Sequence, residues 1–364
     1  MNKQKIIDPY GSELIQDYSK LITDFHLEKF EPSLFPNPNR LMRRGVVFSG
    51  LGQKAIADAI RGKKPFYVLS GIMPSGEKIH FGTKTVVENI AYFQKHGAET
   101  FILVADLEAA ATRAVSLEQA KKRALDFHIP AYIALGLDPG RTTFYFQSEN
   151  VEVMRATAAL SRKVTLNQFM ALYGNAEPER ILSAITQVAD ILYPQFRKRM
   201  PGIIPVGPDQ LPHILLTRDV VGRMRSEKYV PPSAIFNKYT PSLDGSMKMS
   251  KSKPESCIEL PEDPRLACRK IGRALSGGRD SLAEHRKLGA VVEKDMAFEL
   301  LKQHLVEDDQ ELGRIYREYR SGRMTSGEVK EIACQRMTEF MRGLESGIRE
   351  ARGRVSELKF VKPV

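Results

Sequence analysis

The chain has 364 residues, of which 42% are apolar, so it can bury a sizeable core, and its length suggests one large domain and a smaller one. Its formal net charge of +11 suits a polyanionic partner such as RNA, although charge alone does not select one class of protein. No apolar run is long enough to span a bilayer and the first eight residues are polar, so we expect a cytoplasmic protein with no membrane segment and no secretory signal.

The first 65 residues are mixed in character, and we expect them to form an N-terminal extension that packs on the next domain. Apolar periodicity predicts a helix over residues 12–25, and prolines at positions 32, 36 and 38 mark an extended loop. Residues 40–45 (Arg-Leu-Met-Arg-Arg-Gly) form a basic cluster, which we interpret as an exposed face of the surface. Residues 52–61 have the pattern of a short helix.

Residues 66–260 alternate buried strands with helices. Strands are predicted at 66–69, 101–105, 143–146, 203–206 and 233–236, and helices at 83–96, 116–135, 151–193 (with a turn at 174–179) and 211–224. This order produces parallel βαβ units, so the predicted fold class is α/β, with a Rossmann-like, doubly wound parallel sheet. Ligands of such sheets bind beyond the carboxyl ends of the strands.

Residues 261–364 show no strand pattern from Pro264 onward, so we predict a separate C-terminal all-α domain. Its helices are expected at 265–275, 295–305, 310–321 and 326–355. Three cysteines, Cys257, Cys268 and Cys334, are too few and too far apart for a disulfide framework or a four-cysteine zinc site, so we expect buried free thiols. The seven histidines have no metal-ligand spacing, and no metal site made by protein side chains is predicted.

A loop with two lysines is the first candidate functional element. Lys248-Met249-Ser250-Lys251-Ser252 lies between Asp-Gly and Lys-Pro pairs, which favours a mobile loop over a helix or strand. Two ammonium groups three residues apart can straddle a polyphosphate. A solvated lysine loop is the ordinary interpretation of such a run.

The second candidate element is the turn between the strand at 66–69 and the helix at 83–96. It contains Pro-Ser-Gly at 74–76 and His80-Phe81-Gly82-Thr83. The N-terminus of a helix presents free N–H groups and a positive dipole end to phosphate. Gly82 allows close approach of a nucleotide, and His80 can donate to a phosphate oxygen. The alternative for His80 is a local helix cap.

Together these two strings resemble the signatures of class I aminoacyl-tRNA synthetases, Lys-Met-Ser-Lys-Ser letter for letter and the other with Thr83 in place of the consensus second histidine. Threonine keeps a hydroxyl donor but lacks the imidazole. Further segments resemble archaeal tryptophanyl-tRNA synthetases over almost the whole chain: 40–45, 73–76, 105–108, 135–139, 144–148, 187–192, 206–210, 216–219, 276–280 and 319–322.

This resemblance implies a Rossmann catalytic domain at 66–260, an anticodon-binding helical domain at 261–364 and a homodimer. It implies L-tryptophan, ATP and tRNA(Trp) as substrates, with Mg²⁺ held mainly by the nucleotide. The catalytic residues would be His80, Thr83, Lys248 and Lys251. The implied ATP-binding residues are Ser75, Gly76, His80, Gly82, Thr83, Lys248, Met249, Ser250, Lys251 and Ser252.

Gln187 and Asp190 lie three apart on one face of a predicted helix, among apolar neighbours. In related synthetases the aspartate at the position of Asp190 accepts a hydrogen bond from the substrate side chain, which would here be the indole N–H. Glu108, Gln187 and Gln210 are candidates for the region of the substrate ammonium and carboxylate groups, although Glu108 could be only a helix N-cap.

Three alternatives remain open. A tyrosyl-tRNA synthetase would share the fold and the lysine loop, but it carries a tyrosine where this chain has Leu69 and Ser70. A catalytically weakened paralogue that binds tryptophan or tRNA is favoured only by Thr83. A nucleotidylyltransferase shares the histidine turn, but it would not need the lysine loop together with a helical C-terminal domain.

Overall fold

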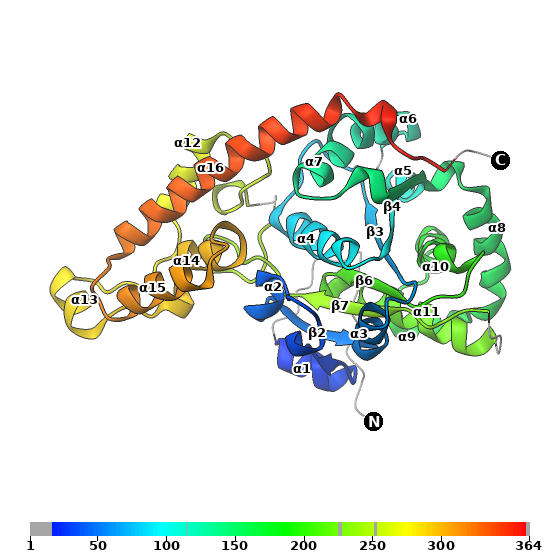
Figure 1. Ribbon diagram of the computed structural model, residues 1–364, viewed down its shortest axis with the longest axis horizontal. Helices are drawn as coiled ribbons and strands as arrows, with labels where there is room; N and C mark the ends of the chain where they lie inside the picture. Colours follow the sequence, from blue (N-terminus) through cyan, green and yellow to red (C-terminus); the bar gives the residue numbers. More distant parts are fainter. Residues whose placement is uncertain (1–16, 114, 225–227, 251–252, 362–364) are drawn as a thin grey trace.

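The computed structural model describes residues 17–113, 115–224, 228–250 and 253–361. Within these residues an α/β part, built on one seven-stranded sheet, lies beside a helical part that ends in the long helix α16 (Ser326–Arg352) (Figure 1). The predicted fold class is therefore confirmed. None of the helices in the described part of the chain combines the length and the apolar character that crossing a membrane requires.

The sheet has the order β1-β2-β7-β6-β3-β4-β5. Its strands are β1 (Glu28–Lys29), β2 (Val47–Leu51), β3 (Tyr67–Ile72), β4 (Glu99–Val104), β5 (Thr142–Phe146), β6 (Gly202–Val206) and β7 (Ser233–Asn237). The five strands from β7 to β5 are parallel, in the predicted doubly wound order, and the direction of winding reverses between β3 and β6. The antiparallel strands β1 and β2 were not predicted; they add an edge beyond β7.

Helices cover both faces of the sheet because successive strand side chains point to opposite sides. Tyr67 and Leu69 pack with residues of α8, α9, α10 and α11, whereas Phe66 and Val68 pack with residues of α3, α4 and α7. The helices of this part are α1 (Tyr18–Asp24), α2 (Arg40–Arg43), α3 (Gln53–Arg61), α4 (Phe81–Lys95), α5 (Asp106–Arg113), α6 (Leu117–Arg123), α7 (Ile129–Ala134), α8 (Val151–Leu160), α9 (Leu166–Tyr173), α10 (Pro178–Leu192) and α11 (Leu211–Met224). The helix predicted at 12–25 begins outside the described residues. Within the described part of that stretch, the helix is α1.

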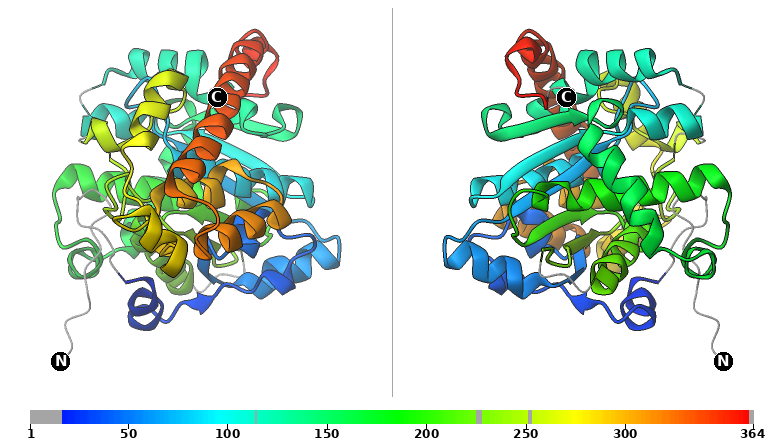
Figure 2. Two further views of the ribbon diagram at one scale, coloured as in Figure 1. Left: turned by 90° about the vertical axis from the view of Figure 1, so that its left-hand side faces the viewer. Right: turned by 90° about the vertical axis from the view of Figure 1, so that its right-hand side faces the viewer.

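The helical part is joined to the α/β part along α16, which packs on both α12 and α7 and runs between the two parts (Figures 1 and 2). Gly347 makes this approach possible, because a Cβ there would lie 2.9 Å from the Cβ of Ala134 on α7. After α16 the chain returns to the sheet, where the Lys359 carbonyl accepts from the Phe144 amide at 2.9 Å. The other helices of this part are α12 (Pro264–Gly272), α13 (Leu282–Leu288), α14 (Met296–Leu300) and α15 (Asp309–Arg320).

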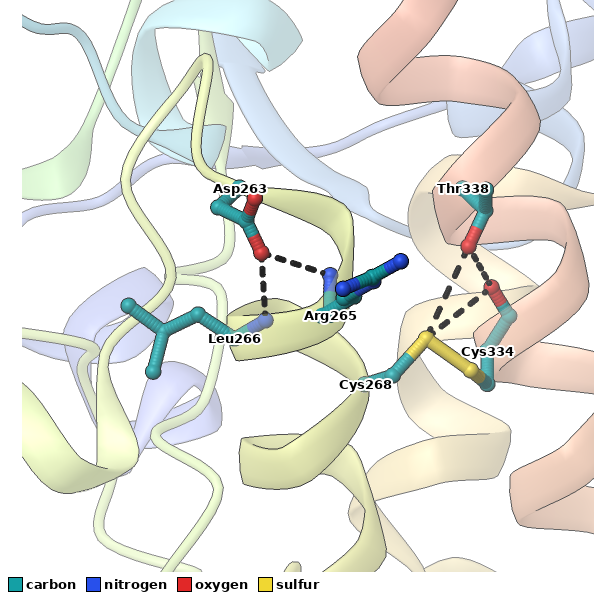
Figure 3. Close-up of a disulfide and its surroundings, with 6 residues drawn as sticks. All are labelled: Asp263, Arg265, Leu266, Cys268, Cys334 and Thr338. Carbon is teal, nitrogen blue, oxygen red and sulfur yellow. Dashed lines mark hydrogen bonds between the residues drawn. A yellow bond between two sulfur atoms is a disulfide. The ribbon is translucent and has the colours of Figure 1, made fainter.

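The expectation of free thiols is wrong for two of the three cysteines. Cys268 on α12 and Cys334 on α16 form a disulfide, shown in Figure 3, whereas Cys257 is buried and takes part in no disulfide within the described residues. Asp263 caps α12 by accepting from the amides of Arg265 and Leu266 at 2.9 and 3.0 Å, which fixes the start of the helix that carries Cys268. Spacing in the sequence gave no sign of this pair, because the contact between α12 and α16 brings the two cysteines together.

The interpretation of residues 40–45 as an exposed basic face is also wrong. Arg40 is buried, and its guanidinium donates to both carboxylate oxygens of Glu88 at 2.7 Å. Arg44 donates to the Lys302 carbonyl at 2.7 Å and to Asp309 at 2.7 Å. The cluster therefore lies between the α/β part and the helical part, because its acidic and carbonyl partners come from distant segments of the chain.

Loss of the disulfide should lower the free energy of unfolding by about 2–4 kcal/mol, because the bond closes a long loop between residues 66 positions apart. Thermal melting of Cys268→Ser, of Cys334→Ser and of the double variant measures this loss. All three should lose the same amount, since each breaks one bond. Dithiothreitol should lower the melting temperature of the unmodified chain but not that of the double variant; equal shifts in both would contradict the prediction.

Candidate active site

The corner between β3 and α4 brings several predicted residues together. His80 is the N-cap of α4, and its ring nitrogen Nδ1 accepts from the amide of Thr83 at 3.3 Å. Gly82 lies beneath this ring: a Cβ there would come within 2.9 Å of two ring atoms of His80. His80 is exposed, and Gly82 and Thr83 are partly exposed. The corner thus presents an imidazole, a hydroxyl and the N-terminus of a 15-residue helix to solvent.

The preceding turn is fixed by its backbone carbonyls. Arg123 donates to the carbonyl of Ser75 at 3.0 Å, and Nε2 of His128 lies 2.8 Å from the carbonyl of Gly76. His128 ends the π-helical turn η2 (Ala124–His128). π-helical turns are rare in proteins as a whole, but they often occur at functional sites. Ser75 and Gly76 are therefore held at the corner by the segment between α6 and α7.

The lysine loop is described as far as Ser250, and the predicted Lys251 and Ser252 lie outside the described residues. The Met249 amide donates to the Thr240 carbonyl at 2.8 Å, and the Met249 sulfur accepts from the Ile258 amide at 3.2 Å. Lys248 places its ammonium group 4.7 Å from the centre of the Tyr239 ring. Backbone contacts on both sides therefore anchor the described end of this loop.

The two signature segments meet at their bases. Ile79 and Leu260 form an antiparallel bridge, in which each amide donates to the other carbonyl, at 3.2 and 3.0 Å. Met249 packs against the apolar cluster that contains Ile79, Phe81 and Leu260. His80 follows the bridge directly, and Leu260 lies ten residues after Ser250, so the bridge holds the helix corner beside the segment that follows the lysine loop.

A buried carboxylate forms the second part of the site. Asp190, on α10, is 1% exposed; it accepts from the Tyr145 hydroxyl at 2.9 Å and from the Gln147 amide at 2.6 Å. Burial raises the pKa of Asp190 to about 7, against the opposing effect of these two hydrogen bonds. Near neutral pH this side chain therefore alternates between an ionised acceptor and a neutral acid.

Glu108 and Gln187 lie in direct contact, as expected for residues that share one site. The Gln187 amide lies 3.0 and 3.2 Å from the two carboxylate oxygens of Glu108, and burial raises the pKa of Glu108. Glu108 is in the first turn of α5, after β4. Gln210 follows β6 in the short helix η7 (Pro208–Gln210), and its amide donates to Asp209 at 3.2 Å. The contacts thus pair Glu108 with Gln187 but place Gln210 beside Asp209.

Tyr145 and Gln147 were not predicted as site residues. They lie two positions apart at the end of β5, so their side chains point to the same side of the sheet, toward α10. Polar side chains at alternate positions next to the carboxyl end of a buried strand were a usable signal in the sequence. That both reach one carboxylate could be learned only from the packing of α10 on the sheet.

The chain is similar to known proteins over almost its whole length. The model of the class I tRNA synthetases (W and Y) matches residues 61–342. A tryptophan–tRNA ligase of Hyperthermus butylicus is 38% identical over 98% of both chains, and one of Methanocaldococcus jannaschii is 38% identical over 95% of this chain and 96% of its own. The crystal structure of tryptophanyl-tRNA synthetase from Aeropyrum pernix superposes with a TM-score of 0.87 at 37% identity, covering 98% of this chain and 99% of that one. The chain therefore belongs to the class I tRNA synthetases of the tryptophan and tyrosine family, and within them to the tryptophan–tRNA ligases.

Proposed function

We propose that this chain activates L-tryptophan with ATP and transfers the tryptophanyl group to tRNA(Trp). The observation that carries the proposal is the pairing of Ile79 with Leu260, because it brings the helix corner and the base of the lysine loop to one place. The full-length likeness to tryptophan–tRNA ligases supports the choice of amino acid.

In the first step a carboxylate oxygen of tryptophan attacks the α-phosphorus of ATP, and the bond to pyrophosphate breaks. The attacking carboxylate is already ionised at neutral pH, so the reaction needs positioning and charge stabilisation rather than a strong base. His80 and Thr83 would contact the nucleotide at the N-terminus of α4, and Lys248 and Lys251 would bind the β- and γ-phosphates. The surrounding contacts are assigned to Ser75, Gly76, Gly82, Met249, Ser250 and Ser252.

Magnesium, held mainly by the nucleotide, would supply positive charge that neutralises the phosphates. The described residues contain no group of three or more His, Cys, Asp or Glu side chains arranged to hold a metal ion. Cationic and hydroxyl side chains at the corner and in the lysine loop instead suit the triphosphate itself. This arrangement fits an ion held mainly by the nucleotide.

Tryptophan would be selected by Asp190, whose carboxylate accepts from the indole N–H, while Tyr145 and Gln147 hold that carboxylate in place. A substrate without the N–H donor leaves this buried acceptor short of one partner, which penalises phenylalanine strongly. Glu108, Gln187 and Gln210 are assigned to the ammonium and carboxylate groups of the amino acid.

The same proposal includes the division into an extension at 1–65, a catalytic domain at 66–260 and an anticodon-binding domain at 261–364. The net charge of +11 supports binding of tRNA, and we place the enzyme in the cytoplasm. A homodimer is supported by exposed apolar side chains on α8, α9 and α10, of which α8 and α10 pack on each other. These are Met154, Leu166, Met170 and Leu182.

Tryptophan binding should strengthen as the pH rises through about 7, because burial raises the pKa of Asp190 to that value and only the ionised form offers a full acceptor to the indole. Below it the Kd should increase by up to about tenfold per pH unit. Fluorescence of the bound indole measures this directly, since the chain contains no tryptophan. Asp190→Asn should weaken binding and remove the pH dependence of the Kd. Glu108→Gln should retain a pH-dependent Kd. A Kd that does not change between pH 6 and 8 in the unmodified chain would contradict this prediction.

Exchange of pyrophosphate into ATP tests the function itself. It should depend on tryptophan and not on tyrosine, which separates the proposal from the tyrosyl alternative; absence of exchange would favour the weakened paralogue.

Lys251→Ala should slow exchange by about 100-fold, because it removes a charge that stabilises the leaving group, with the Kd for tryptophan unchanged. Lys253→Ala is the matched control, because Lys253 pairs with Asp244 at 3.1 Å and lies outside the pentapeptide. An equal loss in both variants would refute the phosphate role of Lys251.

The dimer can be tested by light scattering coupled to gel filtration. Leu166→Glu/Leu182→Glu should convert a dimer to monomers, because it places charges on two side chains that are 61% and 62% exposed in the single chain. Leu288→Glu is the control, since Leu288 is 55% exposed on α13 of the helical part and should leave the dimer intact. A monomeric unmodified chain, or a dimer that survives the double substitution, would refute this surface.

A further inference from the structure

His304 connects the helical part to the corner at residues 80–83. We call this segment the ATP corner, because the proposed function assigns it to ATP. It lies in the π-helical turn η10 (Leu301–Leu305), which follows α14, and it is 4% exposed. Its ring stacks on that of Phe81, with centroids 4.3 Å apart and planes 25° from parallel. Phe81 is the first residue of α4 and stands between His80 and Gly82. A side chain from the helical part thus packs directly on the signature that faces the nucleotide.

The edge of the same ring faces the lysine loop. Nε2 of His304 lies 3.0 Å from the hydroxyl of Thr240. The carbonyl of Thr240 accepts from the amide of Met249 at 2.8 Å, inside the loop signature. One imidazole therefore contacts Phe81 through its face and Thr240 through its edge, and Thr240 lies in the loop after β7 that holds Met249. Phe81 belongs to the first signature, and Thr240 binds the backbone of Met249 in the second.

The hydrogen bonds indicate which tautomer is present. Nδ1 of His304 is buried and has no partner among the described residues, so a proton there would be an unsatisfied donor. With the proton on Nε2, the ring donates to Thr240, whose hydroxyl can turn toward the Gln303 side-chain oxygen at 3.5 Å. Burial and the nearby charges of Lys84 and Arg40 lower the pKa of His304 well below its usual value, in keeping with a neutral ring.

The turn that carries His304 is π-helical. A π turn inserts one extra residue into a helix and leaves a carbonyl without its α-helical partner. The backbone carbonyl of His304 accepts from Lys84 of α4 at 3.3 Å, so the same helix that starts at Phe81 also caps this turn. The π turn that ends at His128 likewise sets a histidine against the Gly76 carbonyl. Both π turns among the described residues thus contact the loop or helix of the ATP corner.

We propose that His304 is a positioning residue for adenylate formation, which holds the helix corner at Phe81 and the Met249 end of the lysine loop in one register. The inference rests on the proposed function and adds a residue outside both signatures to it. The ring is buried, so it would act through Phe81 and Thr240 rather than on a substrate. It acts by fixing the position of Phe81 relative to Thr240, whose carbonyl holds Met249.

Three variants separate the two contacts of the ring. His304→Ala removes both, His304→Phe keeps a ring against Phe81 but loses the bond to Thr240, and Thr240→Val removes that bond from the other side. We expect kcat/KM for ATP in tryptophan-dependent exchange to fall about threefold to tenfold in His304→Phe and in Thr240→Val, the range one hydrogen bond supplies, and further in His304→Ala. The Kd for tryptophan should stay unchanged, because other residues hold the carboxylate of Asp190.

The double variant His304→Phe/Thr240→Val should lose no more than either single variant, since both remove one interaction. His285→Phe is the matched control: His285 is also buried in the helical part, where Nε2 lies 2.8 Å from the Met324 carbonyl, and its loss should cost stability without changing kcat/KM for ATP. Should His304→Ala fail to fold, the other two variants decide.

Unchanged ATP kinetics in Thr240→Val and His304→Phe would overturn the inference, and so would an equal loss in His285→Phe or an equal loss of tryptophan affinity. Those outcomes leave the proposed function intact, because the unmodified chain still supports exchange. A failure of the unmodified chain to exchange with tryptophan is a different result, which removes the proposed function and this inference together.

Discussion

Glu88 lies in the middle of α4 and is shared by two buried cations, the guanidinium of Arg40 and the ammonium group of Lys84. Transfer of three charges out of water costs several kcal/mol per ion, so the arrangement is stable only because each charge finds a partner in good geometry. Arg40 also donates to the Gln303 carbonyl at 3.1 Å and pairs with Glu307. The helix that starts at the His80 corner is thereby tied to α2 on one side and to the helical part on the other, so the position of that corner depends on these buried ion pairs.

Asp190 shows the same physics at the amino-acid end of the site. Among the described residues its carboxylate accepts from Tyr145 and Gln147, and its raised pKa indicates that these two donors do not fully compensate for burial. A third donor from the substrate would complete the set. In the proposed function, affinity and selectivity for an indole N–H would therefore have one physical origin, the residual electrostatic cost of an incompletely solvated carboxylate. The corner at His80 works differently, because its groups remain exposed and gain their order from the backbone.

The sequence predicted what local pattern determines. Apolar periodicity located α11 at residues 211–224 and gave the parallel order of β3, β4 and β5, and the two signatures named the corner and the loop. Features that depend on distant partners were missed. β2 contains Ser49 and Gly50, which disfavour a strand on their own, and it forms because β7 offers an open edge. The buried arginines, the disulfide and the two π turns were hidden for the same reason: each is defined by a partner tens to hundreds of residues away.

The position of Phe81 links the helical part to the corner at His80. Phe81 lies in the apolar cluster that includes Met337, Met341 and Leu344 of α16, not in either layer of the sheet. Cores are packed at the density of organic crystals, so the ATP corner cannot shift without repacking that cluster. α16 has 27 residues and is thus about 40 Å long, which reaches from the corner across α7. The helical part and the corner at His80 thus share one apolar cluster, and His304, which stacks on Phe81, adds a further contact between them.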